Sequence, residues 1–185
     1  MDRSTIEQMK SLYSEHQRLH TVGNLLNLPW QTVYWWLKKE GVSVTGNKEK
    51  HGGLKDQIAL IGERLFSEVT TKAVDQNKLH FQPKFDYLLG DLKLDVKTSF
   101  LRDQCSKTGK VNLRWAFNCR KQQEADYIIC YCLSGELGNH SVENILLIPN
   151  EFIHNLQTIS VSPRKSKWLD FKVSKEELKE FFNQF

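Results

Sequence analysis

The sequence predicts a mixed α/β protein, in which a mixed sheet flanked by helices follows a small domain of three helices. Between residues 54 and 185, short runs of β-branched and aromatic residues alternate with amphipathic stretches. Strands that alternate with helices in this way favour a mixed sheet covered by helices. Before residue 45, by contrast, the apolar residues recur at helical spacing.

The length and composition set the number of domains. The chain has 185 residues, of which 39% are hydrophobic and 26% charged, enough for one ordinary core and at most one small extra domain. The segment 44–53 is polar, contains glycine and shows no apolar periodicity, as is typical of a boundary. We therefore expect a first domain at 1–45, a linker at 46–53 and a second domain at 54–185.

Composition also restricts the cellular setting. No stretch approaches the roughly 20 apolar residues needed to span a bilayer, and residues 1–10 lack the apolar core of a signal peptide. We expect no membrane partner and a cytoplasmic location, in a bacterial, phage or organellar context. The histidines have no mutual spacing that would suggest an HNH-type site, and the cysteines, which we expect to be reduced thiols, form no CxxC pair: Cys105, Cys119, Cys130 and Cys132.

Each element can be placed from its pattern. In the first domain we expect helices at 4–16, 18–26 and 30–40. In the second we expect helices at 54–72, 118–125 and 150–156, and a last helix to about 184 that begins with a capping box formed by Ser174 and Glu177. The expected strands lie near 79–82, 85–89, 92–98, 111–117, 126–133, 144–148 and 158–162.

The second and third helices have the pattern of two helices joined by a tight turn. Gly23 is placed where the helices would cross too closely for a side chain, and Asn27 lies at the turn, where the backbone must be left-handed. Ile6, Met9 and Tyr13 supply the first helix. The residues that would be buried between the other two are Val22, Leu26, Leu28, Val33 and Trp36. Over residues 4–42 the chain resembles the helix-turn-helix domains of resolvases, transposases and phage regulators.

In such domains the second helix of the motif enters the major groove of DNA by its N-terminal half. A plain three-helix interaction module, with its aromatic residues in the core, is the alternative. Trp35 and Trp36 are adjacent and cannot both face one core, which favours an intermolecular role for Trp35. The resemblance implies that the DNA contacts come from Trp30, Gln31, Thr32, Tyr34, Trp35 and Lys38.

The segment 83–99, PKFDYLLGDLKLDVKTS, predicts a β-hairpin with charged residues on one face. Gly90-Asp91 suits a type II′ turn, and this turn would set Asp86 opposite Asp95 and place Lys97 beside them. Two facing carboxylates repel each other, with Cβ atoms about 4.5–5.5 Å apart. A divalent cation relieves that repulsion, and carboxylate oxygens suit Mg²⁺, with Mn²⁺ as a substitute. An exposed hairpin with ordinary surface charges is the alternative.

Two further acidic positions are not assigned to the metal site. Asp91 is an alternative carboxylate, but at the turn it is better explained as a turn former. Asp170 and Lys172 repeat the Asp-x-Lys spacing, but no acidic residue on a partner strand precedes them. We interpret this second pair as surface charge.

The hairpin resembles the PD-(D/E)xK nuclease superfamily, found among restriction enzymes, resolvases and intron-encoded homing endonucleases. The resemblance covers about residues 54–133 and implies a restriction-endonuclease-like fold, with Asp86 and Asp95 as metal ligands and Lys97 positioning or activating the attacking water. It also implies a further metal-site carboxylate from Glu63 in the Gly-Glu-Arg helix, and assistance from Gln122 or Gln123. The literal Pro-Asp pair is absent, because Pro83 lies three residues before Asp86.

The charge distribution is consistent with a DNA partner. The net charge is +4, and residues 98–123 contain six basic residues against one acid, Asp103. We expect a sequence-specific, Mg²⁺-dependent endonuclease, of homing type, that acts on double-stranded DNA as a homodimer or higher symmetric oligomer. A restriction enzyme, a structure-specific resolvase and a non-catalytic DNA-binding regulator remain alternatives. The residues expected to grip phosphates are Arg102, Lys107, Lys110, Arg114, Arg120 and Lys121.

Overall fold

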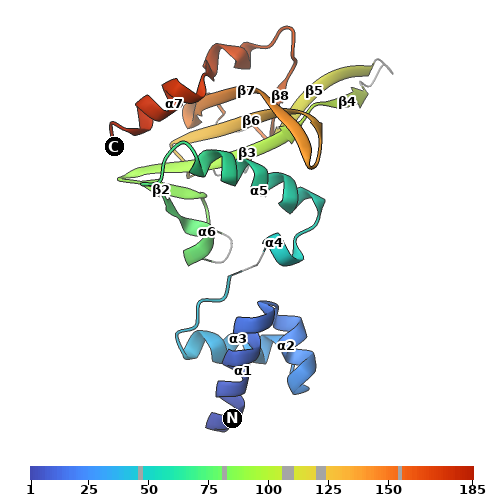
Figure 1. Cartoon of the computed structure of the whole chain (residues 1–185), viewed down its shortest axis with the longest axis vertical. Helices are drawn as coiled ribbons and strands as arrows, with labels where there is room; N and C mark the ends of the chain where they lie inside the picture. The colour runs from blue at the N-terminus through green and yellow to red at the C-terminus, as the bar shows by residue number, and fades with distance from the viewer. Residues whose placement is uncertain (46–47, 81–82, 106–110, 120–123, 154–155) are drawn as a thin grey trace. The chain divides into compact units, whose positions relative to one another are not determined.

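The protein is a mixed α/β protein with a mixed sheet, as the sequence predicts (Figure 1). The computed structural model describes residues 1–45, 48–80, 83–105, 111–119, 124–153 and 156–185. Within those ranges the chain forms seven α-helices, and none of them has both the length and the apolar character needed to cross a membrane.

The chain divides into two compact units. One contains residues 1–52 and 76–83, and the other contains residues 53–75 and 84–185. The segment 76–83 therefore clusters with the N-terminal residues, whereas the sequence analysis places it in the second domain.

The three helices predicted before residue 45 are confirmed as α1 (Arg3–His16), α2 (Leu19–Leu26) and α3 (Trp30–Lys39). Leu26, Leu28 and Trp36 are only partly buried and pack around their core. The fully buried residues are drawn from all three helices and the segment after them: Met9, Tyr13, Val22, Val33, Leu37 and Val44.

The turn between α2 and α3 has the geometry predicted from its sequence. A Cβ atom on Gly23 would lie 2.6 Å from the backbone oxygen of Leu28, so no other residue fits there without moving the backbone. Asn27 adopts φ 52° and ψ 43°, and the Leu28 amide donates to the Gly23 carbonyl at 2.8 Å.

Part of the predicted linker is helical. In α4 (Lys48–His51), Lys50 Nζ donates to the Glu15 carbonyl at 3.0 Å, and His51 Nε2 lies 2.9 Å from the His16 carbonyl. These carbonyls end α1 and have no partner within that helix. Residues 48–51 thus close the C-terminus of α1, while 46–47 lie outside the described residues.

The predicted strand at 79–82 is wrong for its described part. Leu79 ends the short helix α6 (Gln76–Leu79), and the His80 amide donates to the Gln76 carbonyl at 2.8 Å. A segment of four residues is too short for its polar and apolar pattern to separate one turn of helix from a strand.

The second unit is built on a six-stranded sheet with the order β1-β2-β3-β6-β7-β9. β3 and β6 pair in parallel, and the other neighbours are antiparallel. The strands are β1 (Val74–Asp75), β2 (Tyr87–Leu89), β3 (Leu92–Phe100), β6 (Tyr127–Glu136), β7 (Asn139–Pro149) and β9 (Lys172–Val173).

Each face of this sheet is covered by a different layer. α5 (Leu54–Ser67) and α7 (Lys175–Phe182) pack on one face, where Phe66 and Phe182 meet the sheet; Figure 1 shows α5 lying across β3. A three-stranded sheet of β4 (Arg102–Cys105), β5 (Val111–Asn118) and β8 (Thr158–Val161) covers the other face, together with the 3-10 helix η2 (Lys167–Phe171).

Three predicted helices of this unit differ from expectation. α5 ends at Ser67 rather than Lys72, since the Val69 and Thr70 amides both bond to the Phe66 carbonyl, at 2.9 and 3.3 Å. The segment 150–156 begins as a 3-10 helix, η1 (Asn150–Phe152), and 154–155 lie outside the described residues. The helix predicted at 118–125 starts in β5, and its central residues 120–123 also lie outside them.

The last helix begins where the sequence predicts. The Ser174 side chain accepts from the Glu177 amide at 3.1 Å, and the Glu177 carboxylate accepts from the Ser174 amide at 2.7 Å. This reciprocal pair is the predicted capping box, and it starts α7 at Lys175.

Gly62 sets how closely α5 approaches β3. A Cβ atom at this position would lie 1.9 Å from Thr98 Oγ1 and 3.2 Å from Val96 Cγ1. The helix therefore rests on β3 at a distance that only glycine permits.

We predict that Gly62→Ala lowers the free energy of unfolding by about 1–3 kcal/mol, since α5 must shift away from β3. Combining it with Thr98→Ala, which removes the clashing oxygen, should cost less than the sum of the two single changes. Urea unfolding followed by circular dichroism measures both. Gly53→Ala is the control, because nothing lies within 4 Å of its added Cβ; an equal loss there would contradict the packing explanation.

Candidate functional site

The predicted hairpin turn is confirmed. Leu89 pairs with Leu92 and Tyr87 with Leu94, which leaves Gly90 and Asp91 as the two turn residues. Gly90 has φ +58°, whereas Asp91 is not among the residues with positive φ. This combination is that of a type II′ turn, in which only the first central residue requires glycine.

Asp86 does not occupy the expected ladder position opposite Asp95. β2 begins at Tyr87, and the Asp86 amide donates to the Leu94 carbonyl at 2.9 Å. Asp86 and Tyr87 thus both face Leu94, the two-against-one arrangement of a β-bulge. The bulge turns the Asp86 carboxylate toward β3, where its Oδ2 accepts a hydrogen bond from the Val96 amide at 2.9 Å.

Asp95 and Lys97 lie on the face of β3 that is covered by the three-stranded sheet. Asp95 aligns with Ile128 and Lys97 with Cys130 on the parallel strand β6, and both of these partners belong to that core. Asp95 is only 4% exposed. Its Oδ2 lies 2.5 Å from Lys97 Nζ, which forms a largely buried ion pair.

The surroundings of the ion pair favour the charged form of the lysine. Burial opposes the ammonium, but the negative charges of Asp95 and Asp86 outweigh this effect and raise the pKa of Lys97. This places Asp86, Asp95 and Lys97 in one electrostatic cluster. The cluster contains two negative charges and one positive charge, so a bound divalent cation would bring its net charge to +1, which a phosphate could offset.

Two thiols that the sequence analysis leaves without a role lie close to this pair. Burial raises the pKa of Cys130 and of Cys119, and both thiols interact electrostatically with Lys97 and Asp95. Both cysteines are free, as predicted. A raised pKa keeps both thiols uncharged, which suits their buried, apolar surroundings.

Glu63 lies on α5 and therefore on the other face of the sheet. Its backbone carbonyl accepts a hydrogen bond from Tyr87 Oη at 3.4 Å. Burial, followed by the charges of Asp75, Glu63 and Asp86, raises the pKa of Tyr87. Asp75 is an acidic residue that sequence reasoning missed, because β1 has only two residues and gives no detectable pattern.

Of the three predicted metal ligands, Asp86 and Asp95 both interact electrostatically with Lys97, and Glu63 interacts with Tyr87. Among the residues it describes, no group of three or more His, Cys, Asp or Glu side chains is close enough to share a metal ion. Asp86 and Asp95 thus face the same lysine, while Glu63 acts on the neighbouring Tyr87.

The residues predicted to contact DNA fall into three groups. On α3, Thr32 is partly buried, whereas Trp30, Gln31, Tyr34, Trp35 and Lys38 are exposed. Arg102 is exposed on β4 and Arg114 is partly buried on β5. The remaining predicted contacts, and both glutamines considered for catalysis, lie outside the described residues: Lys107, Lys110, Arg120, Lys121, Gln122 and Gln123.

The residues interpreted as a turn former and as surface charge lie on the surface. Asp91, Asp170 and Lys172 are all exposed. Asp126, which the sequence analysis did not single out, fixes the start of β3: its amide donates to the Lys93 carbonyl at 2.7 Å, and its Oδ2 accepts from the Lys93 amide at 2.8 Å.

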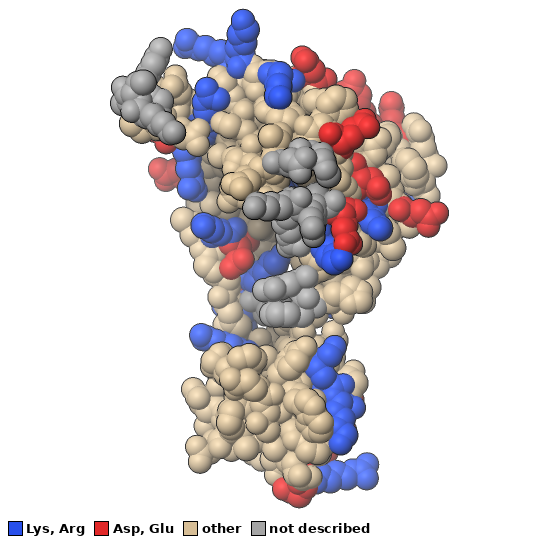
Figure 2. Space-filling view, turned by 180° about the vertical axis from the view of Figure 1, so that it is seen from behind, with Lys and Arg blue, Asp and Glu red and all other residues tan. Residues whose placement is uncertain are grey.

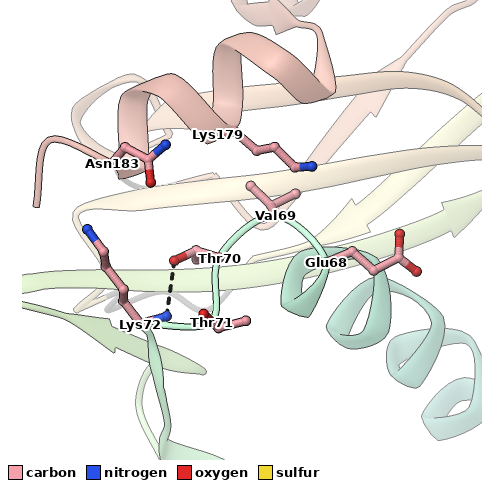
Figure 3. A pocket seen from close by; sticks show the side chains of 7 residues that line it. All are labelled: Glu68, Val69, Thr70, Thr71, Lys72, Lys179 and Asn183. Carbon is pink, nitrogen blue, oxygen red and sulfur yellow. Dashed lines mark hydrogen bonds between the residues drawn. The ribbon is translucent and has the colours of Figure 1, made fainter.

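A cavity of about 270 Å³ lies on the side of the sheet that carries α5 and α7 (Figure 3). Two cationic side chains lie at its rim, Lys72 from the segment after α5 and Lys179 from α7. None of the candidate catalytic residues lines it; the lining residues are Glu68, Val69, Thr70, Thr71, Lys72, Lys179 and Asn183.

No protein-family model matches the chain, and comparison with curated proteins finds no relative.

We predict that Lys97→Met destabilises the fold by about 3–5 kcal/mol, because it leaves the Asp95 carboxylate buried without its cation. The double variant Asp95→Leu/Lys97→Met should be more stable than Lys97→Met, since apolar groups can replace a buried ion pair. Urea unfolding of the wild type, both single variants and the double variant measures the coupling. A double variant no more stable than Lys97→Met would contradict the assigned pairing.

Proposed function

We propose that the chain is a metal-dependent endonuclease that hydrolyses phosphodiester bonds in double-stranded DNA. The observation that carries this proposal is the cluster of Asp86, Asp95 and Lys97 at the bulged end of one hairpin. The cluster contains the parts that phosphodiester hydrolysis requires, two hard oxygen donors and a cation for the developing negative charge.

The donor set fits Mg²⁺. This ion keeps several of its water molecules and is bound through one or two carboxylates together with phosphate oxygens of a substrate. Asp86 and Asp95 meet that requirement without a third protein ligand. Glu63, on the opposite face of the sheet, would then only add negative charge near Tyr87.

The residues of the chain have separable roles in this proposal. The Val96 amide orients Asp86, and Asp95 holds Lys97 in place through the 2.5 Å contact. The Lys97 ammonium stabilises the negative charge that develops on the phosphoryl group and positions the attacking water. Bound Mg²⁺ supplies Lewis-acid polarisation of a phosphoryl oxygen.

We infer a restriction-endonuclease-like core of the PD-(D/E)xK type, preceded by a helix-turn-helix made of α2 and α3. The left-handed Asn27 and the close crossing at Gly23 support the second inference. α3 contains no acidic residue and exposes Trp35, over which Lys39 lies at 5.0 Å from the ring centre, so its free face combines aromatic and positive groups.

The expected target follows from the number of sites. One such site cuts one strand, so a double-strand break requires two copies and a roughly palindromic sequence. Combined with the helix-turn-helix, this favours a homing-type enzyme that works as a homodimer or a higher symmetric oligomer. A restriction enzyme or a resolvase would use the same chemistry on other targets.

Cleavage of a randomised DNA library in the presence of Mg²⁺, followed by sequencing of the ends, tests the activity. We expect cleavage by the wild type, none with EDTA, and a loss of about 10²–10³-fold in rate for Lys97→Ala, because a charge-stabilising contact is removed. Lys172→Ala is the matched control, since Asp170 and Lys172 have the same spacing but are exposed. A wild type that shifts DNA in gels but never cuts it would support the regulator instead.

Metal binding can be measured without DNA. Mg²⁺ at ten times its dissociation constant should add about 1.4 kcal/mol to the free energy of unfolding. We predict that Asp86→Ala abolishes this stabilisation, whereas Asp91→Ala, an exposed acid at the turn, retains it. Equal Mg²⁺-induced stabilisation of both variants, measured by thermal unfolding, would place the metal elsewhere.

A further inference from the structure

The three-stranded sheet has an outer face whose composition differs sharply from its inner face. Alternate residues of β5 and β8 point inward, where Trp115, Phe117 and Ile159 are buried in the core. The strand register assigns the others to the opposite side, named here the outer face: Arg102, Gln104, Asn112, Arg114, Ala116, Asn118, Thr158 and Ser160. Apart from Ala116, every residue on it is polar.

Two arginines lie directly opposite each other on this face. Arg102 of β4 pairs with Arg114 of β5, and like charges at directly opposed positions destabilise a sheet. Arg114 Nη1 donates to Ser160 Oγ at 3.4 Å, which confirms that Arg114 and Ser160 share a face. The fold thus places two positive charges where they repel.

No described side chain of the outer face offsets that charge. Asp103 is the acid closest in sequence, but it pairs with Leu113 and so points to the other side of the pair of strands β4 and β5. Neither arginine forms an ion pair within the part of the chain that the structure describes. Figure 2 shows basic side chains gathered on one side of this unit and most of the visible acidic ones on the other.

We propose that the outer face is a second DNA-reading surface, which enters the major groove and sets part of the target sequence. This inference rests on the proposed endonuclease function. The major groove admits a two-stranded β-ribbon, and β4 with β5 forms one that extends past the core (Figure 1). Arginine, glutamine and asparagine are the side chains that pair with guanine and adenine edges there.

The short connection between Lys97 and β4 limits how far from the cut the outer face can read bases. β3, which carries Lys97, leads into β4 with only Leu101 between them, and Ser99 Oγ accepts from the Ala116 amide at 3.0 Å. Gln104, the outer-face residue of β4 farthest from Lys97 along the chain, comes seven positions after it, a span of at most about 24 Å. At about 3.4 Å per base pair, the bases read by the ribbon lie within about seven pairs of the scissile phosphate.

The test compares the sequences cleaved from the randomised library by the wild type and by variants of the outer face. Gln104→Ala, Asn112→Ala and Arg102→Lys should each relax the base preference within about seven pairs of the cut and leave distant positions unchanged. Arg102→Lys keeps the charge but loses the two-pronged hydrogen bonding of the guanidinium, so the salt dependence of binding should stay the same. Arg102→Ala should weaken binding of the selected target by about 5- to 150-fold.

Lys179→Ala, at the cavity on the opposite side of the sheet, removes the same charge and should alter neither preference nor affinity. Thermal unfolding of each variant verifies that its fold is intact. Cleavage by all variants with unchanged base preference would overturn the inference and leave the endonuclease function standing. So would a uniform loss of affinity for all sequences, or equal competition by duplex RNA, whose major groove is too narrow for the ribbon.

The outer face can also be tested if the wild type cuts no DNA. If the wild type cuts no DNA, gel shifts with sequences selected for binding replace the cleavage readout. Relaxed binding preference in Gln104→Ala and Asn112→Ala would then support the outer face as a DNA-reading surface in a protein that does not cut, and unchanged preference would overturn it.

Discussion

The central strand β3 is buried on both faces, and the rest of the second unit depends on how its side chains divide between two cores. Leu94 and Val96 face α5 and α7, whereas Asp95 and Lys97 face the smaller sheet. A charged pair in this position is costly to bury unless the two groups neutralise each other. The ion pair at 2.5 Å meets that condition and at the same time holds an ammonium beside two carboxylates.

The hairpin shows how a local irregularity produces this cluster. A regular ladder would have set Asp86 opposite Asp95 with nothing to orient it. The bulge at Asp86 and Tyr87 lets the carboxylate accept the Val96 amide instead. β-Bulges commonly redirect a side chain next to a functional site, and here the redirected group is one of the two proposed metal ligands.

Much of the fold and of the hairpin could be predicted from the sequence, because the signals are local. The type II′ turn requires glycine at Gly90, Asn27 tolerates a left-handed backbone, and Ser174 caps the N-terminus of α7. The features that escaped prediction depend on distant residues. Asp86 is oriented by the amide of Val96, ten residues away, and Asp75 lies in a two-residue strand that is recognisable only from its pairing with β2. Leu79 belongs to a helix of one turn, which is too short for its pattern to be told from that of a strand.

The junction between β3 and β4 has a mechanical consequence. Leu101 joins the two strands, and its amide donates to the Leu133 carbonyl of β6 at 2.8 Å, so even this single linking residue is fixed to the central sheet. A displacement of the ribbon therefore passes into the strand that carries Lys97 instead of being absorbed by a loose hinge. If the ribbon reads DNA as proposed, a poor fit to a near-match sequence would displace the Lys97 ammonium, so that specificity would be expressed in the rate of bond cleavage as well as in the strength of binding.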